Sequence, residues 1–178
     1  MRKLAAIAAA ALACAVSVSS AEERPVYQPP DLALQKEKVS AFSVLEGDWR
    51  GEGWMYGGDG KKREFTQTEK VRFMLDGTIM TVHGTGRSKG AAPDAKPDFE
   101  AFAVISWDEK EVAYRFRSYA NGHYGEFPIT PREGGGFEWT LPGVRYEAVV
   151  TEHSWTEKGY RIGAGEPVQF FEMTVMRK

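Results

Sequence analysis

Cysteine is nearly absent from this chain. Cys14 is the only one among the 178 residues, and it lies in an alanine-rich stretch before Ala21. That stretch has the features of a cleavable secretion signal, and its removal would leave no cysteine at all. We therefore expect a mature chain without disulfides, thiolate metal sites or a cysteine nucleophile.

Histidine is scarce, and no common catalytic motif is present. His83, His123 and His153 are the only histidines and are separated by 40 and 30 residues, whereas zinc sites use clustered histidines or cysteines. There is no Gly-x-Ser-x-Gly elbow for serine chemistry. The glycine-rich run at 57–60 is not followed by a helix that would hold phosphate. We expect no metal site and no catalytic residues, which favours a non-enzymatic role.

Charge of neither sign dominates. The chain has 23 basic and 25 acidic residues, and loss of Arg2 and Lys3 with a signal would leave 21 basic ones. No basic stripe occurs along the chain. This balance disfavours nucleic acid and anionic membrane surfaces as partners.

The N-terminus predicts export. Arg2 and Lys3 precede an uncharged stretch at 4–18, which is too short and too alanine-rich for a membrane span. Ser19 and Ala21 are small residues at the two positions that a signal peptidase recognises. We expect residues 1–21 to be a signal peptide and the protein to be periplasmic or secreted.

A lipoprotein anchored through Cys14 is the alternative. Alanine occupies Ala11, where lipoprotein signals usually have a larger aliphatic residue, and Cys14 would leave an unusually short leader. Cleavage near Ala21 is therefore favoured.

The remaining length fits one domain. We expect a flexible lead-in at 22–38, because 22–30 contains three prolines and no apolar period. The lipocalin-like domain would then span 39–178. Within the lead-in, Asp31 is a candidate helix N-cap. A short helix is also indicated by apolar residues at three-residue spacing, namely Val39, Phe42 and Leu45.

From Trp49 onward, short runs of β-branched and aromatic residues end in turn signals, which indicates an antiparallel β domain. Most links are of hairpin length, which favours an up-and-down barrel over a sandwich. Residues 87–98 form the one long link, either a lid or an inert loop. The expected strands are 49–56, 63–75, 78–86, 99–107, 112–119, 124–130, 137–141, 144–151, 155 with 160–162, and 168–177. Lys158 and Gly159 are expected to form a turn before 160–162.

The inward face of each strand can be predicted from alternation, by choosing the face with more apolar residues. This choice places polar and aromatic side chains together inside, as in small-molecule sites. The inward set also includes Val112, Phe116 and Val144, and a slip of one residue would exchange the faces. The expected ligand-binding residues are Gln67, Glu69, His83, Tyr114, Trp139, Tyr146 and Glu172.

For two of these residues, the prediction that they face inward depends on alternatives that the sequence leaves open. Glu69 lies inside only if its end of the strand is not exposed to solvent. In the last strand, either Val168, Phe170 and Glu172 or the residues between them face inward. If Glu172 faces inward, it joins Glu69 as a possible acid–base pair for glycoside chemistry.

Several motifs resemble a known family. Residues 47–53 (GDWRGEG) look like the Gly-x-Trp-x-Gly-x-Gly entry to the first strand of calycin barrels. Residues 65–69, 75–78, 103–108 and 169–174 resemble a bacterial family of uncharacterised lipocalin-like (calycin) domains. The resemblance spans about residues 40–178. It implies an all-β, about ten-stranded antiparallel barrel with a short N-terminal helix, in which Trp49 plugs the closed end.

The same entry motif is similar to that of the nitrobindins, which hold haem through a histidine in the last strand. Here the corresponding stretch, residues 169–172 (QFFE), has no histidine, so His83 or His153 would have to replace it. We therefore expect no cofactor.

The sequence thus predicts an exported barrel that binds a small, partly apolar ligand. A nitrobindin-like haem protein is one alternative. The other is a module for protein partners, with Trp54, Tyr56 and Trp155 as exposed contacts. The sequence does not define the ligand or the oligomeric state.

Overall fold

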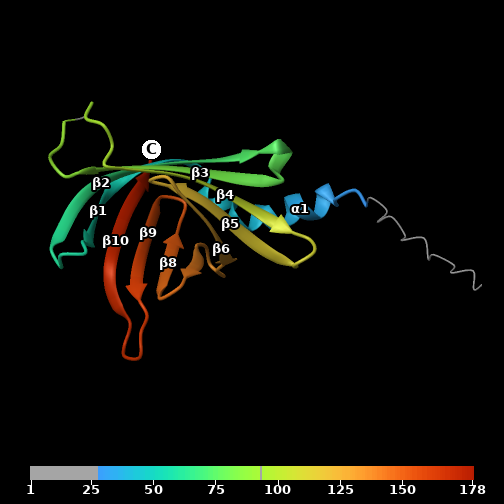
Figure 1. Cartoon of the computed structure of the whole chain (residues 1–178). Coiled ribbons are helices and arrows are strands. Elements are labelled where there is room, and N and C mark those ends of the chain that lie inside the picture. The colour runs from blue at the N-terminus through green and yellow to red at the C-terminus, as the bar shows by residue number, and fades with distance from the viewer. Residues whose placement is uncertain (1–27, 93) are drawn as a thin grey trace, which may run out of the picture.

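The computed structural model describes residues 28–92 and 94–178 (Figure 1). The expected signal at 1–21 lies outside these residues, as do residues 22–27 of the lead-in. Within the described ranges no helix is both long and apolar enough to cross a membrane. The elements are α1 (Leu32–Val39), η1 (Ser40–Leu45), β1 (Gly47–Tyr56), β2 (Lys62–Met74), η2 (Leu75–Gly77), β3 (Ile79–Ser88), β4 (Phe99–Asp108), β5 (Ala113–Ala120), β6 (His123–Pro131), β7 (Phe137–Leu141), β8 (Val144–Val150), β9 (Ser154–Arg161) and β10 (Val168–Arg177).

The N-terminal helix begins where the sequence predicts. The Asp31 carboxylate accepts a hydrogen bond from the Leu34 N–H and caps α1. α1 continues into the 3₁₀ helix η1, whose period of three residues matches the apolar spacing. Val39, Phe42 and Leu45 are accordingly buried. The domain boundary expected between residues 38 and 39 falls inside α1, so this helix belongs with the barrel that it covers.

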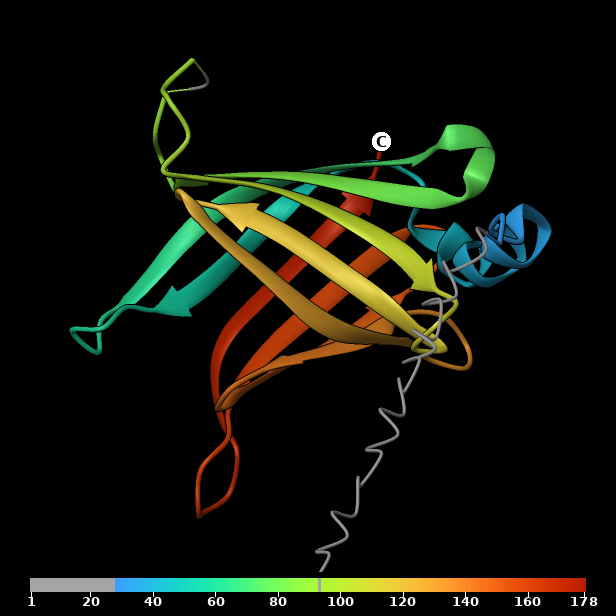
Figure 2. The same cartoon turned by 45° about the vertical axis from the view of Figure 1, so that its right-hand side comes forward.

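The ten strands close into an antiparallel barrel. Each strand pairs with its neighbours in sequence, and β1 closes the ring by pairing with β10 (Figure 2). This confirms the up-and-down barrel. Closure also gives both edge strands a hydrogen-bonded partner.

One strand is longer than the sequence indicates. β9 runs without interruption through Lys158 and Gly159, which we expected to form a turn. Gly159 is a buried strand residue because the Tyr146 ring of β8 occupies the space where a Cβ would lie. The glycine therefore marks a close side-chain approach within the sheet.

The helix and η1 close one end of the barrel. Trp49 is 1% exposed there and donates from Nε1 to the Leu45 carbonyl at 2.8 Å. The Arg177 guanidinium lies 4.1 Å from the Trp49 ring centroid and donates to the carbonyl oxygens of Val44, Glu46 and Glu152. Trp49 thus plugs this end, as expected.

Solvent reaches the inner wall from the opposite end, which we call the mouth. Along the inward face of β4, Ile105 is 1% exposed, Ala103 3% and Phe99 41%. Because the barrel is closed around its circumference, this gradient indicates access through the mouth. The barrel interior is therefore buried at the α1 end and reached by solvent at the mouth.

The prediction of which face of β3 points inward is wrong. The cross-strand partners of Val71 and Glu69 in β2 are Val82 and Gly84, so Ile79, Thr81 and His83 face outward. The apolar count misleads here because the inward face carries Gly84 and Gly86. A Cβ at Gly84 would lie 2.7 Å from a Glu69 carboxylate oxygen, so the glycine leaves room for that side chain.

In β10 the structure selects the second alternative. Phe171, Met173 and Val175 face inward, and a register shift lies between Gln169 and Phe171. Glu172 pairs with Trp54 and Lys158 on the outer face. The expectation that Glu172 joins Glu69 inside is therefore wrong.

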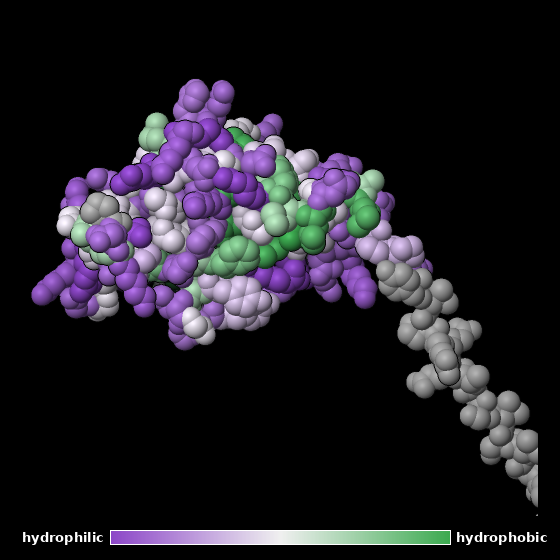
Figure 3. All heavy atoms as spheres, turned by 90° about the horizontal axis from the view of Figure 1, so that it is seen from above, coloured by the Kyte–Doolittle hydropathy of each residue, from purple (hydrophilic) through white to green (hydrophobic). Residues whose placement is uncertain are grey.

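The described parts of the long link, residues 87–92 and 94–98, lie at the mouth end of β3 and β4. Asp98 fixes its base by accepting from the backbone N–H and the hydroxyl of Ser88. Much of the surface is hydrophilic, but Figure 3 shows a hydrophobic band on one face, toward the α1 end of the molecule. Exposed apolar residues at that end include Leu32, Met74 and Leu75.

Candidate functional site

Two carboxylates face the barrel interior without a basic partner. Glu69 on β2 is 6% exposed and Glu157 on β9 is 7% exposed. Neither forms an ion pair with any residue that the structure describes. A buried carboxylate that lacks a counter-charge is costly when ionised, so these two residues are the most unusual feature of the interior.

The Glu69 carboxylate is held by one neutral donor. Its Oε1 accepts a hydrogen bond of 2.7 Å from Nε2 of Gln67. Burial raises the pKa of Glu69 to about 8; the Gln67 bond opposes this shift, and the charge of Glu157 adds to it. The two carboxylates are therefore electrostatically coupled, and protons bind readily here near neutral pH.

Glu157 accepts from an aromatic donor. The indole Nε1 of Trp139 lies 3.0 Å from its Oε1. The indole N–H of Trp155 also faces this carboxylate and opposes the rise of the Glu157 pKa. Its geometry does not meet that of a hydrogen bond, so Nε1 of Trp155 has no hydrogen-bond partner among the described residues. Burial prevails and raises the pKa of Glu157 to about 7.

Aromatic rings form the wall beside these carboxylates. Trp139 and Tyr146 stack with centroids 4.3 Å apart and an interplanar angle of 3°. Phe171 packs edge-on against Tyr146 and stacks on Phe65 nearer the mouth. Burial raises the pKa of the Tyr146 hydroxyl to about 12, so this group stays a neutral donor. Apolar rings with a few polar groups are the usual composition of a small-molecule site.

The structure brings four of the expected site residues together. Gln67 and Glu69 form one pair on β2, while Trp139 and Tyr146 form a second across β7 and β8. Tyr114 also faces inward but lies at the closed end, where its hydroxyl donates to the Lys38 carbonyl of α1. Its position indicates a role in attaching the helix.

His83 and Glu172 lie on the outer face. Nε2 of His83 is 2.8 Å from Oε1 of Glu100, and the side chain is 40% exposed. Glu172 accepts from the Gln169 amide. Neither can contact a molecule inside the barrel without a change of register.

Glu157 is the interior residue that sequence reasoning missed. The turn expected at Lys158 and Gly159 broke the strand and hid the alternation. An unbroken strand would have placed Trp155, Glu157 and Gly159 on one face. Trp155 is likewise 3% exposed rather than a surface contact, which weakens the hypothesis of a protein-partner surface that includes it.

The histidines do not fit an interior haem. His83 lies on the outer face, and His153 is exposed in the turn between β8 and β9 at the closed end. A haem inside the barrel would therefore lack both proposed axial ligands. No group of three potential metal ligands occurs among the described residues.

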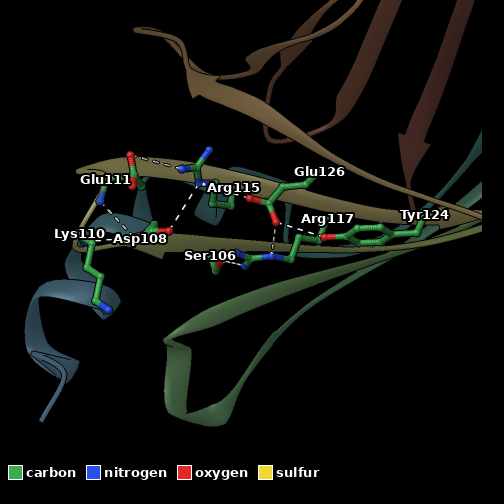
Figure 4. Close-up of polar contacts among 8 residues, drawn as sticks. All are labelled: Ser106, Asp108, Lys110, Glu111, Arg115, Arg117, Tyr124 and Glu126. Atoms are coloured by element: carbon green, nitrogen blue, oxygen red, sulfur yellow. Dashed lines mark hydrogen bonds and ion pairs between the residues drawn. The ribbon is translucent and has the colours of Figure 1, made fainter. Parts of the chain in front are cut away.

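Arg115 and Arg117 point outward from β5, and nearby carboxylates neutralise their charges, as Figure 4 shows. Nε of Arg117 lies 2.8 Å from Glu126, which also accepts from the Tyr124 hydroxyl. Arg115 lies 3.6 Å from Asp108 and 3.5 Å from Glu126. The paired carboxylates make this row a poor anion site.

No protein-family model matches the chain, and no curated protein matches it. Among solved structures, Rv2717c from M. tuberculosis has a TM-score of 0.57 at 12% identity, covering 83% of this chain and 99% of that one. The S-type phycobiliprotein lyase CpeS from Guillardia theta has a TM-score of 0.51 at 9% identity, covering 84% and 98%. These likenesses and the ten-strand ring show a calycin-like, lipocalin-like fold.

Proposed function

We propose that this protein is an exported carrier or sensor that binds a small, partly apolar ligand in the interior of its barrel. The ligand would stack on Trp139, Tyr146 and Phe171 and present a hydrogen-bond donor to Glu69 and Glu157. The observation that carries this proposal is the burial of two carboxylates without a basic partner beside a wall of aromatic rings.

The charge of the site selects the chemistry of the ligand. A donor group, above all a protonated amine, would compensate the cost of the buried negative charge. An anionic group would add to the repulsion between Glu69 and Glu157. The fold supports the proposal as well, since pockets in the mouths of β-barrels commonly hold small molecules.

Native mass spectrometry of protein purified without refolding is the first test. We expect a co-purified small molecule that is released by denaturation. Calorimetric titration with two probes of similar size and opposite charge then tests the site itself. Phenethylamine is expected to bind at least tenfold more tightly than phenylpropionate, which corresponds to about 1.4 kcal/mol.

Matched variants locate the binding. Glu69→Gln and Glu157→Gln should each weaken the preference for the amine, because each removes one carboxyl group that a bound ammonium group would hold in its ionised form. Glu172→Gln changes the same residue type on the outer face and should leave it intact. Equal binding of both probes, or a Glu172→Gln variant that loses the preference, would contradict the proposed role of the interior carboxylates.

A further inference from the structure

A second surface of the barrel has the features of a binding site. Four ring-bearing side chains occupy paired positions on the outer faces of β3, β4, β5 and β6: His83, Phe102, Tyr119 and Tyr124. Adjacent strands lie about 4.8 Å apart, so these rings form a continuous row across the sheet. We call it the outer aromatic row.

The rings of this row are exposed rather than packed. Phe102 is 44% exposed, Tyr119 52% and Tyr124 57%. The centroids of Tyr119 and Tyr124 are 5.1 Å apart with planes tilted by 42°, and those of His83 and Phe102 are 6.4 Å apart with a tilt of 55°. The row is therefore a twisted platform and not a flat one.

A pocket of about 620 Å³ lies over this platform. Lys96, Pro97 and Asp98 of the long link line one side of it, and Asn121 of the β5–β6 turn and His123 at the start of β6 line another. Positive φ values at Asn121 and Gly122 give the tight hairpin turn that holds this side beside the rings. The volume lies within the range of small-molecule sites.

The position of Tyr124 is fixed from outside the pocket. Its hydroxyl donates to Oε2 of Glu126 at 3.2 Å, and Arg117 binds the same oxygen at 2.8 Å (Figure 4). The ring is thereby tethered in place although its face is open to solvent. A tethered ring loses less conformational entropy when a ligand stacks on it.

The charges in the pocket exclude an anion as the favoured ligand. The lining holds one lysine, Lys96, against the two carboxylates of Asp98 and Glu100. A phosphate backbone requires the opposite balance. Among the polar groups that remain, the Asn121 amide and the imidazoles of His83 and His123 both donate and accept hydrogen bonds, and the Glu100 carboxylate accepts them.

We infer that the outer aromatic row and its pocket bind a neutral oligosaccharide chain. The C–H groups on a sugar face carry partial positive charge and suit the negative face of an aromatic ring. The sugar hydroxyl groups suit the mixed donors and acceptors at the rim, which include Glu100, Asn121 and His123. The twist of the row favours a single soluble chain, whose own sugar rings are rotated relative to one another, over a flat insoluble surface.

Calorimetric titration of the full chain with cellotetraose, maltotetraose and chitotetraose tests this inference. At least one of these neutral probes is expected to bind. Tyr119→Ala and Tyr124→Ala should each weaken that binding at least tenfold, since each removes a stacking face. Tyr56→Ala, an exposed tyrosine on the outer face of β1, is the matched control and should bind as the unaltered protein does. Circular dichroism verifies that each variant folds.

Binding of none of the three probes would overturn the inference, as would binding that survives the double variant Tyr119→Ala/Tyr124→Ala. Tighter binding of oligo-dT through the same tyrosines would assign the row to nucleic acid instead. Self-association by sedimentation that disappears in Tyr119→Ala would assign it to a second copy of this chain. Glu157→Gln should leave saccharide binding unchanged, so this result and that for the barrel interior are separable.

Discussion

The indole Nε1 of Trp139 donates a hydrogen bond of 3.0 Å to Oε1 of Glu157, reaching from β7 across the inner face of β8 to β9. The bond places the Glu157 carboxylate beside the stacked pair of Trp139 and Tyr146. A single neutral donor offsets only part of the cost of a buried charge. Glu157 therefore retains a raised pKa and the capacity to bind a further donor.

Replacing Trp139 by phenylalanine should separate the two roles of this residue. Trp139→Phe keeps a ring against Tyr146 but removes the donor, so we expect the pKa of Glu157 to rise above about 7. Above pH 8 the loss of a hydrogen bond to a charged group should cost about 1–3 kcal/mol of unfolding free energy. Carboxyl NMR titration and urea unfolding measure the two effects. Trp54→Phe, on the outer face, is the control, and an unchanged Glu157 titration would count against the bond.

The stability of the protein should fall as pH rises from about 4.5 to 8. Glu69 and Glu157 have a pKa of about 8 and about 7 in the folded chain, against 4.5 as the ordinary value. The folded chain then holds more protons than the unfolded chain across this range. The stabilisation is complete below the unfolded pKa and is lost as pH passes the folded pKa, with a slope of up to about 1.4 kcal/mol per pH unit for each group.

Urea unfolding at a series of pH values checks this dependence. Glu69→Gln and Glu157→Gln should each flatten the profile, because glutamine does not titrate. Glu172→Gln should preserve it. A profile that is flat for the unaltered protein would show that the carboxylates are not buried as described.

Barrel closure should depend on Gly51. A Cβ at this position would lie 2.0 Å from the Thr174 carbonyl oxygen of β10, which is backbone and cannot rotate away. We expect Gly51→Ala to cost at least the 1–3 kcal/mol or so typical of overpacking. Gly58→Ala is the matched control, since nothing lies within 4 Å of a Cβ there. Thermal unfolding of both variants measures the difference, and equal stabilities would contradict the β1–β10 contact.

Arg177 should stabilise the closed end. Arg177→Met removes a cation–π contact with Trp49 and leaves the carbonyl oxygens of Val44, Glu46 and Glu152 without this donor. We expect a loss of about 2–4 kcal/mol in guanidinium unfolding. Arg63→Met breaks an exposed ion pair with Asp59 and should cost about 0–1 kcal/mol. Similar losses in both variants would argue against the role of Arg177.

Export remains a proposal and has a direct test. Intact-mass measurement of protein from the cell envelope or the medium should give a chain that begins at Glu22. Ala21→Arg should block this cleavage, because the signal peptidase requires a small side chain there. A lipid-modified chain that begins at Cys14, or an uncleaved chain recovered from the cytoplasm, would contradict the prediction.

Strand periodicity predicted most of the barrel because each turn signal interrupts an alternating run. The bounds of β7 and β10 agree at both ends, and the inward faces of β2, β7 and β8 are confirmed. The prediction fails where glycine takes an inward position. Gly84 and Gly159 have no side chain to count as apolar, so the face of β3 and the continuity of β9 were both misjudged.

The sequence by itself determined the strand order and the hairpin connections, because local alternation and turn chemistry specify them. The plug formed by Trp49 was implied by the resemblance of residues 47–53 to the entry motif of calycin barrels. Only the tertiary structure decided that Glu157 meets Trp139 in the interior and that His83 belongs to an outer row of rings. Those relationships depend on register across strands that are distant in sequence. A glycine on one strand leaves room for a large side chain on the next, and alternation along a single strand does not record that complementarity.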